Sequence, residues 1–312
     1  MCRLAAYIGP AISLEEILLK PEHSLVKQSW APREMMEARL NADGYGFGWF
    51  DQEGKPLRYR QTMPIWTDPN LPELGRGLKS DTWVAVVRSA TANIPINLAN
   101  TMPYADEKFQ FMHNGYINQF SRTLRSCMRR EFKPEFEDLI EGNTDSEHLF
   151  ILFKHIMWEI NTNDPAQVLG EMVSRLKKWL KDERALLNIM VTVPGRIWAL
   201  RCAINGNCPS LYYSLNPPAF PGASVVASEP LTDEDDWTEV PPQSLLVFDV
   251  GNEPEQTHVC VPVSEKNEIV KKISALLTSL WDPYSSYPAP DLRTQYHPDL
   301  CQLGWHRCDV SF

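Results

Sequence analysis

Hydrophobic runs with two different periods occur in blocks along this chain, and this arrangement limits its possible folds more than any other feature. Short runs rich in β-branched and aromatic residues, each bounded by turn residues, predict strands. These runs are Arg3–Ile8, Tyr45–Phe50, Trp83–Arg88, Phe109–His113, Leu186–Val193, Ile197–Cys202, Ser224–Ala227, Leu245–Val250 and His258–Val263. Apolar residues at helical spacing predict helices at Leu14–Leu19, Arg33–Leu40, Glu147–Ile160, Val168–Leu180 and Ile269–Leu280. Because strands and helices do not alternate strictly, the pattern favours an α+β fold with antiparallel sheets over a doubly wound parallel sheet.

The length of 312 residues allows one large core. We expect one domain over residues 1–280. Residues 281–312 are rich in Pro, Tyr and Ser, and we expect them to form an irregular tail packed on that domain rather than a separate one.

Charge and hydropathy exclude several classes of protein. The net charge is -10, and no long basic run is present, so a nucleic-acid partner is not expected. The longest uncharged stretch, residues 202–228, is interrupted by prolines and glycines, which is incompatible with a membrane span. Neither a signal peptide nor a CxxC pair is visible, and the seven cysteines are an odd number. We therefore expect a cytoplasmic protein with reduced thiols and no membrane partner.

Cys2 directly follows the initiator methionine. Removal of Met1 would place a free α-amine within reach of the Cys2 thiol, so that one residue supplies both a nucleophile and a general base near neutral pH. Two other interpretations stay open: Cys2 has no role beyond following Met1, or its thiol carries a lipid, although no basic flank supports lipidation.

Two short motifs each have a catalytic and a structural interpretation. His113-Asn114-Gly115 offers an amide and a peptide N–H as donors for an oxyanion, but Asn-Gly is also a common hairpin turn. Thr144 and Glu147 form a capping box before an apolar helix. Asp145 in the first turn of that helix either binds an ammonium group or only complements the helix dipole.

Other motifs lead to weaker expectations. Arg88 ends an apolar strand, where a guanidinium needs a carboxylate partner from the protein or from a substrate. Gly44, Gly46 and Gly48 give a strand one bare face that allows a close approach, but no dinucleotide-binding unit follows. His297, Cys301, His306 and Cys308 have no zinc-site spacing, so neither a metal nor a cofactor is expected.

Four motifs, taken together, resemble those of class II glutamine amidotransferases in order and approximate spacing. They are Met1-Cys2-Arg3, Val87-Arg88-Ser89-Ala90-Thr91, His113-Asn114-Gly115 and Thr144-Asp145-Ser146-Glu147. Two further segments, Asp43–Trp49 and Val226–Leu231, resemble the stand-alone branch of that family, which includes ergothioneine-pathway γ-glutamyl hydrolases and glutathione-degrading amidotransferases. The resemblance implies an αββα sandwich of the N-terminal nucleophile hydrolases. Where the family usually has Asn-x-His-Pro-Phe, this chain has Asn100-Thr101-Met102-Pro103-Tyr104, a difference in the loop beside the pocket.

The resemblance also implies a site. Cys2 is then the nucleophile, and Asn114 with Gly115 forms the oxyanion hole. Arg88 binds the α-carboxylate of a γ-glutamyl group, Asp145 binds its α-ammonium, and Thr91 and His113 complete the substrate pocket.

The function that follows is an amidohydrolase that cleaves the γ-amide of a small γ-glutamyl compound through a Cys2 thioester and releases glutamate. One alternative is a glutaminase subunit that supplies ammonia to a separate synthase partner. An alternative of another class is a non-catalytic glutamine-binding regulatory module.

Overall fold

The computed structural model describes residues 2–34, 40–91 and 94–258, and all of them belong to one compact unit. The predicted helix Ile269–Leu280, the domain boundary at residue 280, the tail and the cluster from His297 to Cys308 lie outside the described residues. The predicted helix Arg33–Leu40 lies largely outside them too, and its described ends, residues 33, 34 and 40, are not helical.

Two antiparallel sheets form the centre of the unit. In the part of the chain that the structure describes, the first sheet has seven strands in the order β11-β9-β10-β1-β4-β2-β3, and the second has six in the order β13-β12-β8-β7-β6-β5. The first sheet comprises β1 (Arg3–Ser13), β2 (Tyr45–Phe50), β3 (Pro56–Gln61), β4 (Lys79–Val87), β9 (Tyr212–Leu215), β10 (Ser224–Ala227) and β11 (Thr238–Glu239). The second comprises β5 (Tyr104–Ala105), β6 (Gln110–Ile117), β7 (Ala185–Val193), β8 (Arg196–Ile204), β12 (Ser244–Asp249) and β13 (Glu255–His258).

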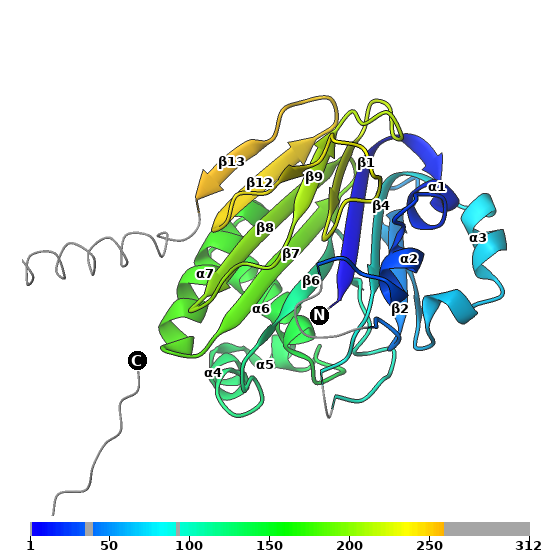
Figure 1. The fold of residues 1–312 in the computed structure, drawn as a ribbon. Helices are drawn as coiled ribbons and strands as arrows, with labels where there is room; N and C mark the ends of the chain where they lie inside the picture. Colours follow the sequence, from blue (N-terminus) through cyan, green and yellow to red (C-terminus); the bar gives the residue numbers. More distant parts are fainter. Residues whose placement is uncertain (1, 35–39, 92–93, 259–312) are drawn as a thin grey trace, which may run out of the picture. The chain divides into compact units, whose positions relative to one another are not determined.

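Helices cover the outer face of each sheet. The first sheet contacts α1 (Leu14–Leu18), α2 (Leu25–Trp30) and α3 (Leu71–Gly77), whereas the second contacts α6 (Asp145–Glu159) and α7 (Pro165–Leu180). Figure 1 shows α6 and α7 along one face of the second sheet and α1, α2 and α3 beside β1 and β4. The shorter α4 (Leu124–Glu131) and α5 (Pro134–Glu137) pack against α6. These four layers confirm the predicted αββα, α+β fold.

The alternation of side chains along β1 explains the layering. Leu4, Ala6 and Ile8 belong to the same buried cluster as the second sheet. Ala5 and Tyr7 instead join the cluster beneath α1, which is the pattern expected of a strand buried on both faces. The burial of α6 almost all round and the single apolar stripe of α7 also agree with the sequence prediction.

The bare face of β2 is used for close contact between the sheets. A Cβ atom on Gly48 would lie 1.8 Å from Oε1 of Gln110 on β6, so any larger residue would displace the Gln110 side chain. Gln110 donates through Nε2 to the carbonyl oxygen of Trp49 at 2.6 Å. The predicted close approach at the Gly-x-Gly-x-Gly strand is therefore confirmed, and its occupant is a side chain of the opposite sheet.

Several structural features differ from the sequence prediction. The strands β3, β5, β9 and β11 and the helices α2, α3, α4 and α5 were not predicted, and β6 continues to Ile117 rather than ending at His113. Within the described residues, no helix is both long enough and apolar enough to cross a membrane.

Candidate active site

The register of the first sheet brings Cys2 next to Arg88. Arg3 pairs with Val87 and Leu4 with Val86, so the same antiparallel register places Cys2 opposite Arg88. The Cys2 thiol lies 3.9 Å from the carbonyl oxygen of Ser89, and Cys2 is 9% exposed. A long-range strand pairing therefore joins two motifs that are more than 80 residues apart in sequence.

A cavity of about 720 Å³ opens at this end of the sheets. Six of the predicted site residues line it, namely Cys2, Arg88, Thr91, His113, Gly115 and Asp145. They come from the start of β1, the segment after β4, the strand β6 and the start of α6. The predicted site is thus one pocket, except for Asn114, which is not among the lining residues.

His113, Asn114 and Gly115 lie within β6 and form no hairpin turn. Asn114 pairs with Asn188 and Gly115 with Leu187 on β7, so the hairpin interpretation was wrong. A Cβ atom on Gly115 would lie 1.8 Å from the carbonyl oxygen of Leu186, which requires glycine at this position.

Asn114 is fully buried between the sheets. Its Nδ2 donates to Oγ of Ser228 at 3.0 Å, and the backbone N–H of Leu4 donates to the same oxygen at 3.1 Å. The Oδ1 atom of Asn114 has no hydrogen-bond partner among the described residues. Ser228 therefore connects the candidate oxyanion strand to the strand that begins beside the nucleophile.

The His113 ring is engaged on both nitrogens. Nε2 lies 2.9 Å from the carbonyl oxygen of Leu186 and Nδ1 lies 2.9 Å from Oγ of Ser146. Because a carbonyl only accepts, Nε2 carries a proton, and in the neutral ring Nδ1 accepts from the Ser146 hydroxyl. His113 therefore connects β6, β7 and α6 rather than presenting a free nitrogen to the cavity.

Asp145 is held in place at the start of α6. Its Oδ2 accepts from the backbone N–H of Ile117 at 2.9 Å and its Oδ1 from that of Ser146 at 2.8 Å. Each carboxylate oxygen can accept a further hydrogen bond, so the group remains able to bind an ammonium ion in the cavity. This contact to β6 means that Asp145 does more than complement the helix dipole.

The capping box before α6 is only half formed. Thr144 caps the helix by accepting from the N–H of Glu147 at 3.1 Å. The Glu147 carboxylate, however, accepts from the N–H groups of Glu141 and Gly142 instead of returning to Thr144. Burial raises the pKa of Glu147 above its usual range, against the lowering effect of these donors.

Arg88 is 4% exposed, and its guanidinium makes one hydrogen bond within the described residues. Its Nη1 donates to the carbonyl oxygen of Asp43 at 3.2 Å, and the Asp43 carboxylate accepts from the N–H of Ala90 at 2.7 Å. No carboxylate forms an ion pair with Arg88 in the part of the chain that the structure describes. A buried guanidinium of this kind is suited to bind the carboxylate of a ligand.

The loop that differs from the family pattern is joined to the start of α6. Asn100 donates through Nδ2 to Oδ1 of Asn143, and the N–H of Asn143 donates to Oδ1 of Asn100, both at 2.9 Å. Asn100, Met102 and Asn143 also line the cavity. The substituted loop is therefore part of the cavity wall.

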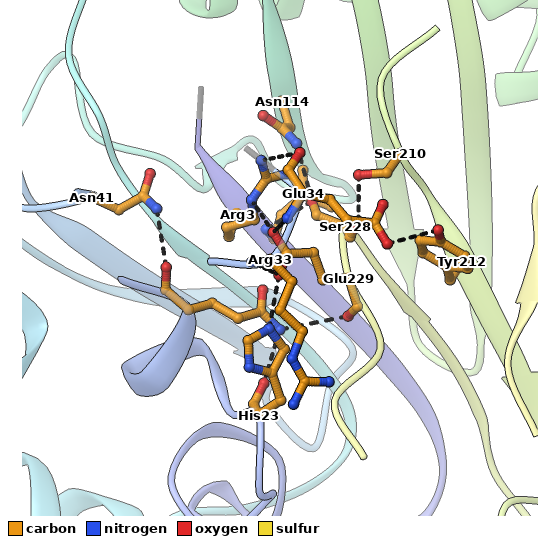
Figure 2. Close-up of polar contacts among 12 residues, drawn as sticks. Arg3, His23, Arg33, Glu34, Asn41, Asn114, Ser210, Tyr212, Ser228 and Glu229 are labelled. Carbon is orange, nitrogen blue, oxygen red and sulfur yellow. Dashed lines mark hydrogen bonds and ion pairs between the residues drawn. The ribbon is translucent and has the colours of Figure 1, made fainter. Parts of the chain in front are cut away.

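Behind β1, on the face away from Cys2, lies a buried ionic cluster (Figure 2). Glu229 is fully buried. It forms an ion pair with Arg3, whose Nε lies 2.9 Å from Oε1, and it accepts hydrogen bonds from Nε2 of His23 at 2.7 Å and from the N–H groups of Arg33 and Glu34. Burial acts to raise the pKa of Glu229, but the His23 hydrogen bond and the Arg3 charge hold that pKa below its usual range. The residue next to the nucleophile is thereby fixed by a fully paired carboxylate.

Three residues near the site were given no role from the sequence. Glu229 stands in an otherwise uncharged segment, Val226–Leu231, and an isolated carboxylate in such a run is a signal for a buried ion pair. Ser228 beside it carries no comparable signal. Arg125 lines the cavity, but its sequence neighbourhood is typical of an exposed helix.

A metal site is not evident in the described ranges, where no group of three or more His, Cys, Asp or Glu side chains could hold an ion.

Comparison with known proteins places this geometry in a family. A family model for class II glutamine amidotransferases matches residues 20–200, more than half of the chain. The γ-glutamyl-hercynylcysteine sulfoxide hydrolase of Mycolicibacterium smegmatis is 29% identical over 246 residues, which cover 79% of this chain and 95% of that protein. A probable glutamine amidotransferase of Saccharomyces cerevisiae, DUG3, is 28% identical over 294 residues, covering 80% and 82%.

Solved structures agree with the sequence comparison. A glutamine aminotransferase class-II domain protein from Silicibacter pomeroyi matches with a TM-score of 0.61 and 25% identity, over 82% of this chain and 99% of that one. The allosteric regulatory enzyme of purine biosynthesis matches with a TM-score of 0.58 at 16% identity, over 84% of this chain and 50% of its own, and shows the shared fold alone. The chain therefore belongs to the class II glutamine amidotransferases, which confirms the family predicted from its motifs and the expectation of an enzyme that acts on amides.

Proposed function

We propose that this protein hydrolyses the γ-amide bond of a γ-glutamyl compound, with Cys2 as nucleophile and glutamate as the acyl product. The observation that carries the proposal is the cavity that brings together the Cys2 thiol, the Arg88 guanidinium and the Asp145 carboxylate. A free γ-glutamyl group has an α-carboxylate, an α-ammonium and an electrophilic γ-carbonyl, and these three groups match the three side chains. The relatedness to an enzyme named for hydrolysis of a γ-glutamyl compound supports the same substrate class.

In the proposed reaction, the Cys2 thiolate attacks the γ-carbonyl carbon and the oxyanion accepts a hydrogen bond from the N–H of Gly115. The second donor is proposed to be the Nδ2 hydrogen of Asn114 that is not given to Ser228, although Asn114 lies behind the cavity lining. The C–N bond then breaks, and the leaving amine takes a proton from the Cys2 α-ammonium. Water, deprotonated by the Cys2 α-amine, next attacks the thioester, and its C–S bond breaks to release glutamate and the thiolate. The α-amine is available for these steps only after Met1 has been removed, because in the Met1-bearing chain this nitrogen belongs to a peptide bond.

The acyl site is proposed to require both charges of the γ-glutamyl group. Arg88 would bind the α-carboxylate through two parallel hydrogen bonds, and Asp145 would bind the α-ammonium. A substrate that lacks either charge leaves a buried group of the protein unpaired, and this type of mismatch gives discriminations of up to about 10⁴-fold.

The test is a panel of γ-glutamyl amides with different amines, together with glutamine and the Nα-acetyl form of each. We expect release of glutamate and free amine from the γ-glutamyl compounds and very low kcat/KM for the acetylated forms. Acetylated and free substrates with kcat/KM values within a factor of ten would show that Asp145 does not bind the α-ammonium.

The same panel decides between the two alternative functions. Turnover of glutamine alone, increased by a second protein that consumes ammonia, would identify a glutaminase subunit of a synthase. Binding of glutamine without turnover of any amide would identify a non-catalytic regulatory module.

A further inference from the structure

The cavity contains one more cation than the proposed acyl site uses. Among the described residues, its charged lining residues are Arg88, Arg125 and Asp145. The α-carboxylate and α-ammonium of a γ-glutamyl group occupy Arg88 and Asp145 and neutralise both. Arg125 then remains as an unpaired positive charge in the wall of the cavity.

The guanidinium of Arg125 has no partner among the residues that the structure describes. It is the second residue of α4 and is half-buried, and its backbone N–H donates to the carbonyl oxygen of Phe120 at 3.0 Å. Within the described residues, its side chain makes no hydrogen bond and no ion pair. Other arginines of the same helix do have partners: Arg129 pairs with Glu137 at 3.5 Å, and Arg130 donates to the Cys127 sulfur at 3.4 Å.

The segment before α4 contributes mainly polar side chains to the cavity wall, beside the apolar Phe120. Asn118, Gln119 and Ser121, from the loop between β6 and α4, line the cavity close to it in sequence. Asp145 is the one carboxylate in the described lining, and two backbone N–H groups already bind it. At about 720 Å³ the cavity is within the range of pockets that enclose drug-sized ligands, so it has room beyond a glutamine molecule.

We propose that Arg125 binds a carboxylate on the leaving-group side of the substrate, so that the enzyme favours γ-glutamyl derivatives of amino acids or peptides over glutamine. This inference rests on the proposed function, because it assumes that the acyl group occupies Arg88 and Asp145. The charge of this carboxylate does not change during the reaction, so its contact with Arg125 is equally strong in the ground state and the transition state and chiefly lowers KM rather than raising kcat.

The test compares γ-glutamyl-alanine with γ-glutamyl-alanine amide, which differ only in the leaving-group carboxylate. For the unaltered protein we expect kcat/KM to be about 10- to 100-fold higher for the acid, the usual effect of a hydrogen bond to a charged group. In Arg125→Gln this preference is expected to fall to about one, mainly through KM, and in Arg125→Lys to be partly retained. The matched control is Arg122→Gln, since Arg122 is exposed on the turn before α4 and does not line the cavity.

Equal kcat/KM values for the acid and the amide in the unaltered protein would overturn the inference, as would a preference that persists in Arg125→Gln. Both results leave the proposed function intact, since both peptides are still cleaved. Failure to cleave either peptide or glutamine would instead overturn the proposed function. If Arg125→Gln does not fold, the ratio of kcat/KM for the acid and the amide is compared between the unaltered protein and Arg125→Lys. A ratio that is unchanged in Arg125→Lys would then overturn the inference.

Discussion

The two faces of the chain at the start of β1 differ in whether their charged side chains have partners in the protein. Behind the strand, Arg3 and His23 both form ion pairs with the carboxylate of Glu229, and all three side chains are buried. On the cavity side, Arg88 and Arg125 have no carboxylate partner among the described residues. Cys2 and Arg3 are neighbours in sequence but belong to different faces. The charges on the Arg3 face stabilise the fold, whereas those on the Cys2 face are proposed to bind a ligand.

The energetic reason is the high cost of burying an unpaired charge. A buried ion pair adds little net stability, but loss of one partner leaves the other uncompensated. A buried charge without a protein partner, such as Arg88, is therefore a candidate for binding a ligand group of opposite charge.

The largest expected effect concerns the nucleophile. Cys2→Ala should lower kcat by about 10⁴-fold or more, because the covalent route is lost, while the free energy of unfolding changes little. Cys127→Ala is the matched control, since Cys127 is a half-buried thiol outside the cavity. Steady-state kinetics and denaturant titration measure the two quantities, and comparable losses of activity in both variants would contradict the assignment.

On the face with paired charges, substitutions should change the free energy of unfolding. Glu229→Gln leaves Arg3 without its compensating charge and should lower the free energy of unfolding by about 3–5 kcal/mol. Asp249→Asn, which breaks a more exposed pair with Arg196, should cost about 1 kcal/mol or less. Chemical denaturation at neutral pH measures both changes. Similar losses in the two variants would show that burial does not make the Glu229 ion pairs more important for stability than an exposed pair.

Acid should destabilise the protein because of another buried group, His148 on α6. Burial lowers the pKa of His148 to about 4, and its Nδ1 lies 2.8 Å from the carbonyl oxygen of Thr144. Below pH ~6.5 the unfolded chain binds a proton that the folded protein takes up only near pH 4. The free energy of unfolding should therefore fall by about 3 kcal/mol as the pH decreases across this range.

His148→Asn tests this pH dependence by removing the titrating group while keeping a donor for Thr144. The variant should be less stable overall, but its free energy of unfolding should be flatter between pH 6.5 and 4. The exposed His258 provides a control, since His258→Asn should leave the slope unchanged. An unaltered slope in His148→Asn would assign the acid sensitivity to another group.

The smallest expected effects are those of replacing Arg88 and Arg3 by lysine, and the two replacements should affect different properties. Arg88→Lys should reduce kcat/KM about 10- to 100-fold with little change in melting temperature, since a lysine cannot make the two parallel hydrogen bonds to a carboxylate. Arg3→Lys should do the reverse, lowering stability by about 1–3 kcal/mol while leaving kcat/KM nearly unchanged. If both variants lose activity alike, the division between the two faces of β1 is wrong.

The sequence predicted the layers better than the contacts between them. Apolar strands such as Ala185–Val193 are visible because both their faces are buried, whereas β3 (Pro56–Gln61) was missed because it is a polar edge strand with a proline. Asn114-Gly115 has a strong local turn preference, and only pairing with β7, about 70 residues later, holds it in a strand. Local conformational preferences do not predict pairings between strands that are far apart in sequence.

The same reason explains what was found and missed at the site. Cys2, Arg88 and Asp145 were found because each belongs to a recognisable motif, although their proximity depends on strand register. Glu229 contacts Arg3 across more than 220 residues of sequence, and Arg125 differs from its paired neighbours only in what surrounds it in space. Roles that depend on tertiary neighbours need the folded structure.

The most direct test of the central claim is covalent labelling with a diazoketone analogue of glutamine, followed by intact-mass measurement and peptide mapping. We expect one adduct per chain, on Cys2, in protein that lacks Met1, with activity lost in proportion to labelling. An adduct on another cysteine such as Cys127, or full activity in protein that wholly retains Met1, would contradict the assignment of Cys2 as the N-terminal nucleophile.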